Sequence, residues 1–400
     1  MIKHAITLFL VVFTFFATSN AIAQSTGTIK VIKNPYAGID WERVNQYMAN
    51  FHAHTVNSDG RVEPDHLINM YADAGYSILA ISDHDLYYIT RPGESDPGPT
   101  TETTWPWTRW IDEQPSQIWD YSGMETSAFY PDLGDGGMLA IRANELTQHP
   151  HIISLFNDCG FAESNQTDNS RLDCIESKNG LGYYAHPPLY MPPEKWSNVL
   201  GNSFEKAAAH FADHIIRYPG NLGIELPSFV QDEAVKLFDK ILMAHYRDHD
   251  IFAHGGDDTH ETYVKQNADY TIVLAEELTE EAVRHALQNG QTIVGSRTQY
   301  PPIINRIEVD SASSRIIVDI LDPRLELIRP TEGSIAGNPP EFEWGSKIQI
   351  TWFKNGQEYA TGNSIDYSGF TEETVLRFEF VSGDETFYSQ AFYIAPEEGI

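Results

Sequence analysis

The sequence predicts an α/β fold that carries an all-β region at its C-terminal end. Between residues 47 and 300, short apolar runs alternate with segments of helical periodicity. Such alternation is typical of parallel sheets, and the number of repeats favours a barrel. After Pro301 and Pro302 the helical period disappears, while apolar runs separated by turns continue. We therefore expect a barrel followed by a β-rich accessory domain.

The N-terminal segment, residues 1–23, has the features of a cleaved signal peptide. Lys3 provides a positive charge, residues 5–18 form an apolar run without charges, and residues 21–23 read AIA, a small-x-small cleavage pattern. The apolar run is short for a membrane span, and no cysteine follows the cleavage site to carry a lipid. We expect a mature protein that is periplasmic or extracellular.

The charge balance narrows the possible partners. The chain has 57 acidic and 26 basic residues, which gives a formal net charge of −31. This excess argues against nucleic acid or an anionic membrane as partner, because both would be repelled. It does not exclude an anionic small molecule or oligosaccharide, since bound metal ions can reverse the local charge. The sequence carries no signal for an oligomeric state.

Two cysteines, Cys159 and Cys174, lie in one polar stretch. In an oxidising compartment they favour a disulfide that closes a short loop. Two free buried thiols are the alternative. Zinc binding by this pair is disfavoured because the spacing is too wide for such sites.

The first domain, expected over residues 24–300, contains two helices with clear ends. One begins at Pro64 and ends at Gly75; the other begins at Thr279, has acidic residues in its first turn, and ends at Gly290. The expected strands of this domain are Tyr47–Ala53, Ile78–Ser82, Met138–Ala143, Ile152–Phe156, Gly182–Ala185, Leu222–Leu226, Ile251–Ala253 and Tyr270–Leu274.

A long insertion, residues 91–137, interrupts this pattern and is rich in Pro, Gly, Asp and Trp. A loop of this length in a compact domain is more often a lid or binding loop than filler. Its tryptophans could stack on a sugar or another ring, or could pack the loop against the barrel. They are Trp105, Trp107, Trp110 and Trp119.

The C-terminal region, residues 301–400, is expected to form a β-sandwich-like appendage. It contains no histidine and few candidate ligands, so we expect it to dock and not to react. Its expected strands are Arg306–Val309, Arg315–Ile320, Lys347–Phe353, Thr374–Val381 and Thr386–Ile394.

Histidines and acidic residues gather at the ends of the expected strands. His52 and His54 are two apart, so on an extended strand they share a face, and Asp59 can fold back from the following turn. Functional residues collect at the carboxyl ends of parallel strands. Imidazole and carboxylate without thiolate suit zinc, manganese or iron better than calcium or magnesium. The further residues in such positions are Asp83, His84, Asp85, Glu145, His149, His151, His186, Asp257, Asp258 and His260.

These motifs resemble the polymerase and histidinol phosphatase (PHP) family. The segment HAHTVNSDGRVEPDHLINMYADAGYSILAISDHD resembles its opening motifs, and NEL, HIISLF, AHP and GDDTH resemble its later ones, in order. The resemblance covers about residues 47–300. It implies a distorted (β/α)7 barrel that holds two or three divalent metal ions (Mn, Zn or Fe).

The resemblance also implies three sets of metal ligands. The first set is His52, His54, Glu145 and Asp258; the second shares Glu145 and adds His151 and His186; the third is Asp59, His84 and His260. The sequence departs from the family pattern at three positions. His149 competes with His151, Asp257 stands where a small residue is common, and His254 is unusual in its strand.

The implied activity is that of a metal-dependent phosphoesterase acting on a small phosphorylated compound. Asp83, Asp85 or His149 could relay the proton. The candidate contacts to an anionic substrate, each also readable as an ordinary surface or structural residue, are Arg142, Arg171, Arg297 and Lys195. A second reading is a metal-dependent lyase, dehydratase or hydrolase of acidic oligosaccharides, which export and the tryptophan-rich insertion favour. A third is a metal- or carbohydrate-binding protein without catalysis.

Overall fold

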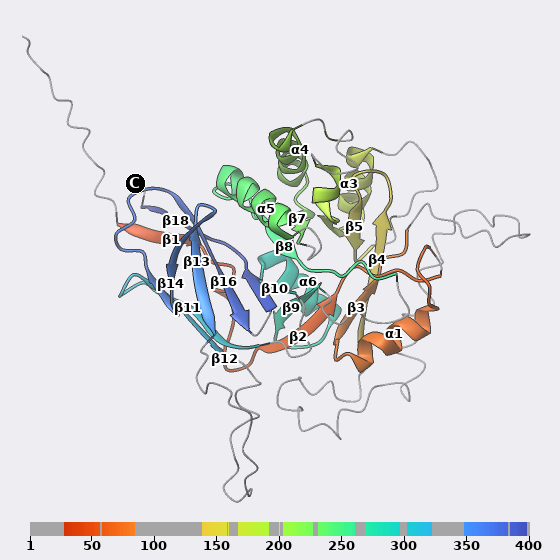
Figure 1. Cartoon of the computed structure of the whole chain (residues 1–400), viewed down its shortest axis with the longest axis horizontal. Helices are drawn as coiled ribbons and strands as arrows, with labels where there is room; N and C mark the ends of the chain where they lie inside the picture. The colour runs from red at the N-terminus through yellow and green to blue at the C-terminus, as the bar shows by residue number, and fades with distance from the viewer. Residues whose placement is uncertain are drawn as a thin grey trace, which may run out of the picture.

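The computed structural model describes most of the two expected domains (Figure 1). The described residues are 28–56, 58–84, 138–157, 159, 167–191, 200, 203–226, 231–260, 269–296, 302–321, 348–382 and 385–397. The expected signal peptide, the insertion with its tryptophans, and Asp85, Lys195 and Arg297 lie outside these residues.

The domain before residue 300 is built on a curved mixed sheet with the order β10-β9-β2-β3-β4-β5-β6-β7-β8. Pairs β2–β3, β3–β4, β6–β7 and β7–β8 are parallel. The strands are β2 (Asn45–Asn50), β3 (Ile78–Ile81), β4 (Leu139–Leu146), β5 (Ile152–Leu155), β6 (Leu181–Tyr184), β7 (Asn221–Glu225), β8 (Phe252–His254), β9 (Asp269–Ala275) and β10 (Thr292–Ser296).

The sheet is parallel in large part, as the sequence predicts, but two of its strands run antiparallel to their neighbours. Strand β5 is antiparallel to β4 and to β6, and β9 is antiparallel to β2 and β10. The connection from β4 to β5 is too short for a crossover helix, so the chain turns directly back. This hairpin brings Glu145 near the end of β4 close to His151, which precedes β5.

Side-chain hydrogen bonds link β8, at one end of this strand order, to β9 and β10 at the other end. Gly255, after β8, donates its N–H to Thr271 Oγ1 at 2.9 Å, and this hydroxyl donates to Gly255 O at 3.0 Å. Gln390 accepts from Ala253 N at 2.9 Å and donates Nε2 to Ala253 O at 2.7 Å and to Thr292 Oγ1 at 2.9 Å. Within the described residues, no backbone ladder joins β8 to β9 or β10. A side-chain amide thus bridges the seam between β8 and β10.

The helices pack around this sheet (Figure 1). Thr279 caps the last of them by accepting from Ala282 N, and Gly290 ends it in the left-handed conformation at φ 66°, as the sequence predicts. In the part of the chain that the structure describes, no helix is long and apolar enough to cross a membrane. The helices are α1 (Pro64–Asp73), α3 (Asp168–Ser177), α4 (Phe204–Arg217), α5 (Gln231–His245) and α6 (Glu280–Asn289), with a 3-10 turn η4 (Pro187–Tyr190).

The C-terminal strands continue the same sheet, because β17 pairs antiparallel with β10. Strand β1 pairs with β18, so a segment assigned to the first domain lies among the C-terminal strands. The loss of helical periodicity after Pro302 shows where the β-rich region begins, but it carries no information on which strands pair. The strands are β1 (Ile29–Lys33), β13 (Gln349–Lys354), β14 (Gln357–Thr361), β16 (Thr374–Ser382), β17 (Glu385–Ser389) and β18 (Phe392–Pro396). A second, three-stranded sheet comprises β11 (Ile303–Asp310), β12 (Arg315–Leu321) and β15 (Ser364–Asp366).

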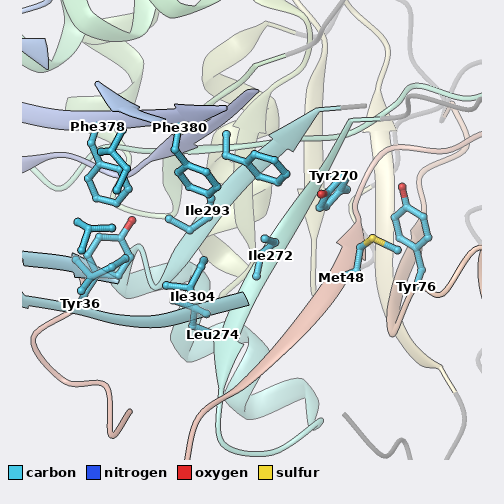
Figure 2. Close-up of a cluster of buried hydrophobic side chains, with 14 of the residues drawn as sticks. Tyr36, Met48, Tyr76, Tyr270, Ile272, Leu274, Ile293, Ile304, Phe378 and Phe380 are labelled. Carbon is cyan, nitrogen blue, oxygen red and sulfur yellow. The ribbon is translucent and has the colours of Figure 1, made fainter. Parts of the chain in front are cut away.

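One apolar core joins the two regions (Figure 2). Ile272 of β9 and Ile293 of β10 belong to the same buried cluster as Phe378 and Phe380 of β16. Ile304, from the second sheet, is part of it too. Because the core and the sheet are both continuous, the C-terminal region supports the first domain directly.

Cys159 and Cys174 are joined in a disulfide, as the sequence favours. Cys174 lies on α3, and Cys159 follows β5. The bond therefore ties α3 to the chain segment that leaves the hairpin next to the clustered histidines.

Candidate metal centre

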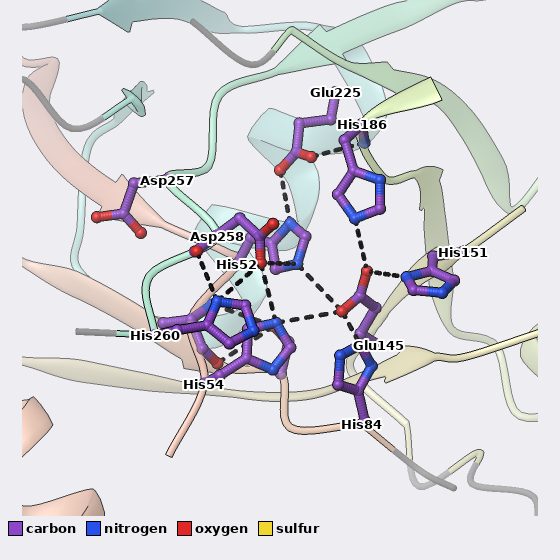
Figure 3. Close-up of polar contacts among 12 residues, drawn as sticks. His52, His54, His84, Glu145, His151, His186, Glu225, Asp257, Asp258 and His260 are labelled. Carbon is purple, nitrogen blue, oxygen red and sulfur yellow. Dashed lines mark hydrogen bonds and ion pairs between the residues drawn. The ribbon is translucent and has the colours of Figure 1, made fainter. Parts of the chain in front are cut away.

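The clustered side chains converge at one end of the sheet (Figure 3). Beyond the end of β2, the chain stays extended through a parallel bridge between Ala53 and Thr259. His52 and His54, on either side of this bridge, point the same way and are completely buried. The strand-end pattern in the sequence therefore leads to a single cluster.

The first group around the centre consists of His52, His54, Glu145 and Asp258. Glu145 Oε2 lies 3.3 Å from His52 Nε2 and 3.1 Å from His54 Nε2. Asp258 Oδ1 lies 3.2 Å from each of the same two nitrogens. Ligands at 2.0–2.1 Å from a tetrahedral zinc ion are separated by about 3.3 Å, so this spacing suits a shared cation.

Unsatisfied buried atoms support the same assignment. His52 Nε2, His54 Nε2 and Glu145 Oε2 are buried without a hydrogen-bond partner, as are His151 Nε2 and His186 Nδ1. Buried polar atoms are normally paired, because an unpaired one costs about 1–3 kcal/mol. Three of these atoms, His52 Nε2, His54 Nε2 and Glu145 Oε2, converge at ligand spacing, as a bound cation requires, so their residues fit the divalent ions that the sequence implies.

A second group consists of His54, Asp59, His84 and His260. Asp59 Oδ1 lies 2.9 Å from His260 Nε2, and 3.7 Å from both His84 Nε2 and His54 Nδ1. This group contains the third ligand set that the resemblance implies, with His54 beside it.

Glu145 also contacts a third side of the cluster. Its Oε1 lies 2.8 Å from His151 Nδ1 and 3.0 Å from His186 Nε2. His84 Nδ1 lies 3.2 Å from Glu145 Oε2, so His84 faces two groups, whereas the resemblance places it in one. His149 belongs to none of the groups found among the described residues and stacks on His151, with ring centroids 5.0 Å apart. Glu145 is therefore the carboxylate that connects the groups.

In the cluster, buried carboxylates and buried histidines shift each other's pKa values. Burial opposes ionisation of Glu145, but His52, His151 and His84 outweigh it and hold its pKa well below the usual range. Burial also lowers the pKa of His54, yet Asp258 and Glu145 raise it to about 10. For His84, burial dominates and lowers the pKa to about 3. Without an ion, protons on histidines such as His54 balance the charge of the ionised carboxylates, and a bound cation would displace these protons.

The backbone is strained at two of the clustered residues. His186 has φ of 30° and Asp258 has φ of 46°, both in the left-handed region that non-glycine residues rarely adopt. Such strain concentrates at functional sites, where the surrounding structure enforces it. It supports a functional role for this end of the sheet.

Sequence reasoning missed Glu225, at the end of β7. Its Oε1 lies 2.9 Å from His52 Nδ1, and its Oε2 accepts from the backbone N–H of His186 at 2.8 Å. It is completely buried. The sequence does contain a signal for it, because Glu225 is a charged residue at the end of the strand NLGIE. Glu145 was identified by the same rule, namely an acidic residue at the end of an apolar strand.

Asp83, a candidate proton relay, contacts the loop that follows His54. Its carboxylate accepts from Thr55 N and Thr55 Oγ1 at 2.6 Å each and from Ser58 Oγ at 2.7 Å. It is buried and holds the loop that follows His54, which is a supporting contact. Asp257 is likewise a support, bound to Tyr71 OH and Asn50 Nδ2, and Figure 3 shows it set apart from the cluster.

The two described arginine candidates, Arg171 and Arg142, lie in different surroundings. Arg171 is completely buried and donates to the carbonyls of Leu146, Gln148 and Pro150. It thereby fixes the loop between Glu145 and His151, which is a structural role. Arg142 is exposed on β4.

Comparisons with known proteins give structural neighbours at low identity. No protein-family model and no curated protein matches the chain. A two-domain protein from Bacteroides vulgatus, described as containing a predicted PHP-like metal-dependent phosphoesterase, is 16% identical, with a TM-score of 0.44 over 92% of this chain and 99% of its own.

Two further neighbours match a smaller share of this chain. A provisionally assigned metal-dependent phosphoesterase from Bifidobacterium adolescentis is 15% identical, with a TM-score of 0.32 over 60% of this chain and 96% of its own. An amidohydrolase from Chromobacterium violaceum, solved with sulfate and no metal, is 15% identical, with a TM-score of 0.32 over 53% and 87%. These values are low, so the functional argument rests on the cluster itself.

Proposed function

We propose that this protein is a PHP-type metal-dependent phosphoesterase acting on a small phosphorylated compound. The observation that carries the proposal is the convergence on Glu145 of five imidazoles, at 2.8–3.3 Å, with carboxylates beside them. Divalent ions bound there would acidify water to a pKa near 7 and offset the charge that develops on phosphoryl oxygens.

The chain's own residues supply position and environment. Glu225 and Asp83 hold His52 and the loop after His54 in place, so the ligands are oriented before any ion arrives. The deep burial of His52 and His54 keeps bulk water from one side of the site. His149, stacked on His151, is the described candidate for moving a proton; burial and the neighbouring imidazoles lower its pKa to about 4.

We also propose that the protein is exported. The expected signal peptide and the disulfide between Cys159 and Cys174 both support this, because disulfides persist in oxidising compartments. The insertion, with Trp105 and Trp107, is proposed to shape substrate choice from the rim of the site, because the chain passes from β3 through His84, which bridges Glu145, before the insertion begins.

The test combines two measurements on purified mature protein. Elemental analysis should find two or three transition-metal ions per chain, and phosphate release should be detectable from a panel of phosphomonoesters. A parallel ultraviolet assay for unsaturated sugars tests the alternative reaction on acidic oligosaccharides. Metal without phosphate release, but with sugar elimination, would replace the phosphoesterase by a lyase. Metal-free protein after metal-replete expression would overturn both.

A further inference from the structure

A second group of metal-ligating side chains lies between α3 and α4, outside the cluster around Glu145. It consists of Asp168, His210 and His214, whose ligand atoms all lie within 4.8 Å of one another. His210 and His214 are four residues apart on α4, so both rings are on one face of the helix. Asp168 Oδ2 lies 2.7 Å from His210 Nε2.

Neighbouring groups orient each of these side chains. His214 Nδ1 lies 2.9 Å from His210 O, and since a carbonyl only accepts, Nδ1 carries the proton and Nε2 the lone pair. Asp168 Oδ1 accepts from Arg171 Nη2 at 2.7 Å, and Oδ2 accepts from Tyr184 OH at 2.9 Å. Metal ligands typically have such outer partners, namely a backbone carbonyl for histidine and donors for the carboxylate.

An ion pair alone accounts for only part of this arrangement. It explains His210, which contacts Asp168, but not why His214 is 8% exposed with its ring centroid 4.5 Å from that of His210. A cation shared by both imidazoles and Asp168 accounts for all three. The His210 side chain is 30% exposed, so water can reach the position and complete the coordination.

We propose that Asp168, His210 and His214 form a separate zinc site with a water as fourth ligand. Two imidazoles and one carboxylate suit zinc, and helical His-x3-His spacing is a recurrent zinc arrangement. The ion would tie α3 to α4. Through Arg171 it would also support the loop that leads to His151. The proposal holds whatever reaction the centre around Glu145 performs.

The test adds Zn²⁺ to the holoenzyme and counts bound zinc after equilibrium dialysis. The wild type should bind one zinc ion per chain more than His210→Ala or His214→Ala. Zinc should also raise the Tm of the wild type more than that of either variant. Turnover measured without added zinc should be the same in all three proteins. His285→Ala, on the exposed side of α6, is the matched control and should keep the additional ion.

Two results would overturn the proposal. One is an equal zinc count in the wild type and in either histidine variant, because all three ligands are required. The other is a loss in His285→Ala as large as in the site variants, which would mean nonspecific binding. Circular dichroism establishes that each variant is folded. If His214→Ala is not, His214→Gln, which keeps the bulk of the side chain, takes its place.

Discussion

Glu225 joins two clustered histidines by different means: it contacts the ring of His52 at Nδ1 and the backbone N–H of His186. The Glu225 side chain is completely buried, so water does not compete for these two contacts. A carboxylate behind a histidine fixes the tautomer and raises the basicity of the ring. Because it reaches a second histidine through the main chain, a change at Glu225 should be felt on both sides of the cluster.

We predict that Glu225→Gln lowers metal affinity by about 10–100-fold, with a smaller effect on folding. The amide can satisfy His52 or His186, but not both as acceptor. Competition with a fluorescent chelator measures the affinity. Glu233→Gln, at an exposed position of α5, is the control and should bind metal as the wild type does.

His54→Ala and His186→Ala should each reduce kcat/KM by a factor on the order of 100 or more while the circular dichroism spectrum stays native. Both side chains contact Glu145 and lie beyond strand ends, whereas the apolar core is built from other residues. A comparable loss of structure in both variants would instead show that the metal ions are needed for folding.

Arg171→Lys should reduce turnover by about tenfold, because lysine keeps the charge but cannot hold several carbonyls of the loop at once. The metal count after dialysis should fall with it, since this loop positions His151. Arg217→Lys, on the exposed end of α4, is the matched control. Normal metal content with normal turnover in Arg171→Lys would contradict the positioning role.

Gln390→Leu should lower the free energy of unfolding by about 3 kcal/mol, because it leaves the N–H and C=O of Ala253 buried without their partner. Denaturant titration measures the change. Gln357→Leu, exposed on β14, should change stability little. A small effect in both would mean that water replaces the amide at the seam.

Asp239→Ala should cost about 3–5 kcal/mol, because it removes the carboxylate that binds two nitrogens of the buried Arg377 guanidinium and leaves only Glu379 beside it. Asp239 and Arg377 form a pair at 2.6 and 2.8 Å that links α5 to β16. The double variant Asp239→Leu, Arg377→Met should recover part of this loss, since the buried guanidinium is removed as well and only Glu379, which is less buried, loses its partner. Thermal unfolding of both variants provides the comparison.

The sequence predicts the place of the cluster better than its internal contacts. The rule that functional side chains gather at strand ends identifies His52, His54 and Glu145, and the structure brings them together. It cannot show that His84 faces two groups, since this depends on how the ring is turned in space. It also cannot separate Asp83, which supports a loop, from residues that line the site.

Long-range pairing is the other part that the sequence does not predict. The apolar run of β5 looks the same whether the strand is parallel or antiparallel, and only the short loop before it decides. The pairing of β1 with β18 leaves no local pattern at all. Periodicity therefore predicts most elements, but not which strands are neighbours.

The pairing of β1 with β18 also affects how late in folding the sheet is completed. Lys30 and Glu397, which form an ion pair beside these strands, are 367 residues apart. A chain is synthesised from its N-terminus, so β1 emerges long before its partner exists. Contacts between such distant segments form slowly, because a large loop must close first. Gln390 bridges Ala253 of β8 to Thr292 of β10, and β17 pairs with β10, so this side of the sheet is complete only when the C-terminal strands have docked.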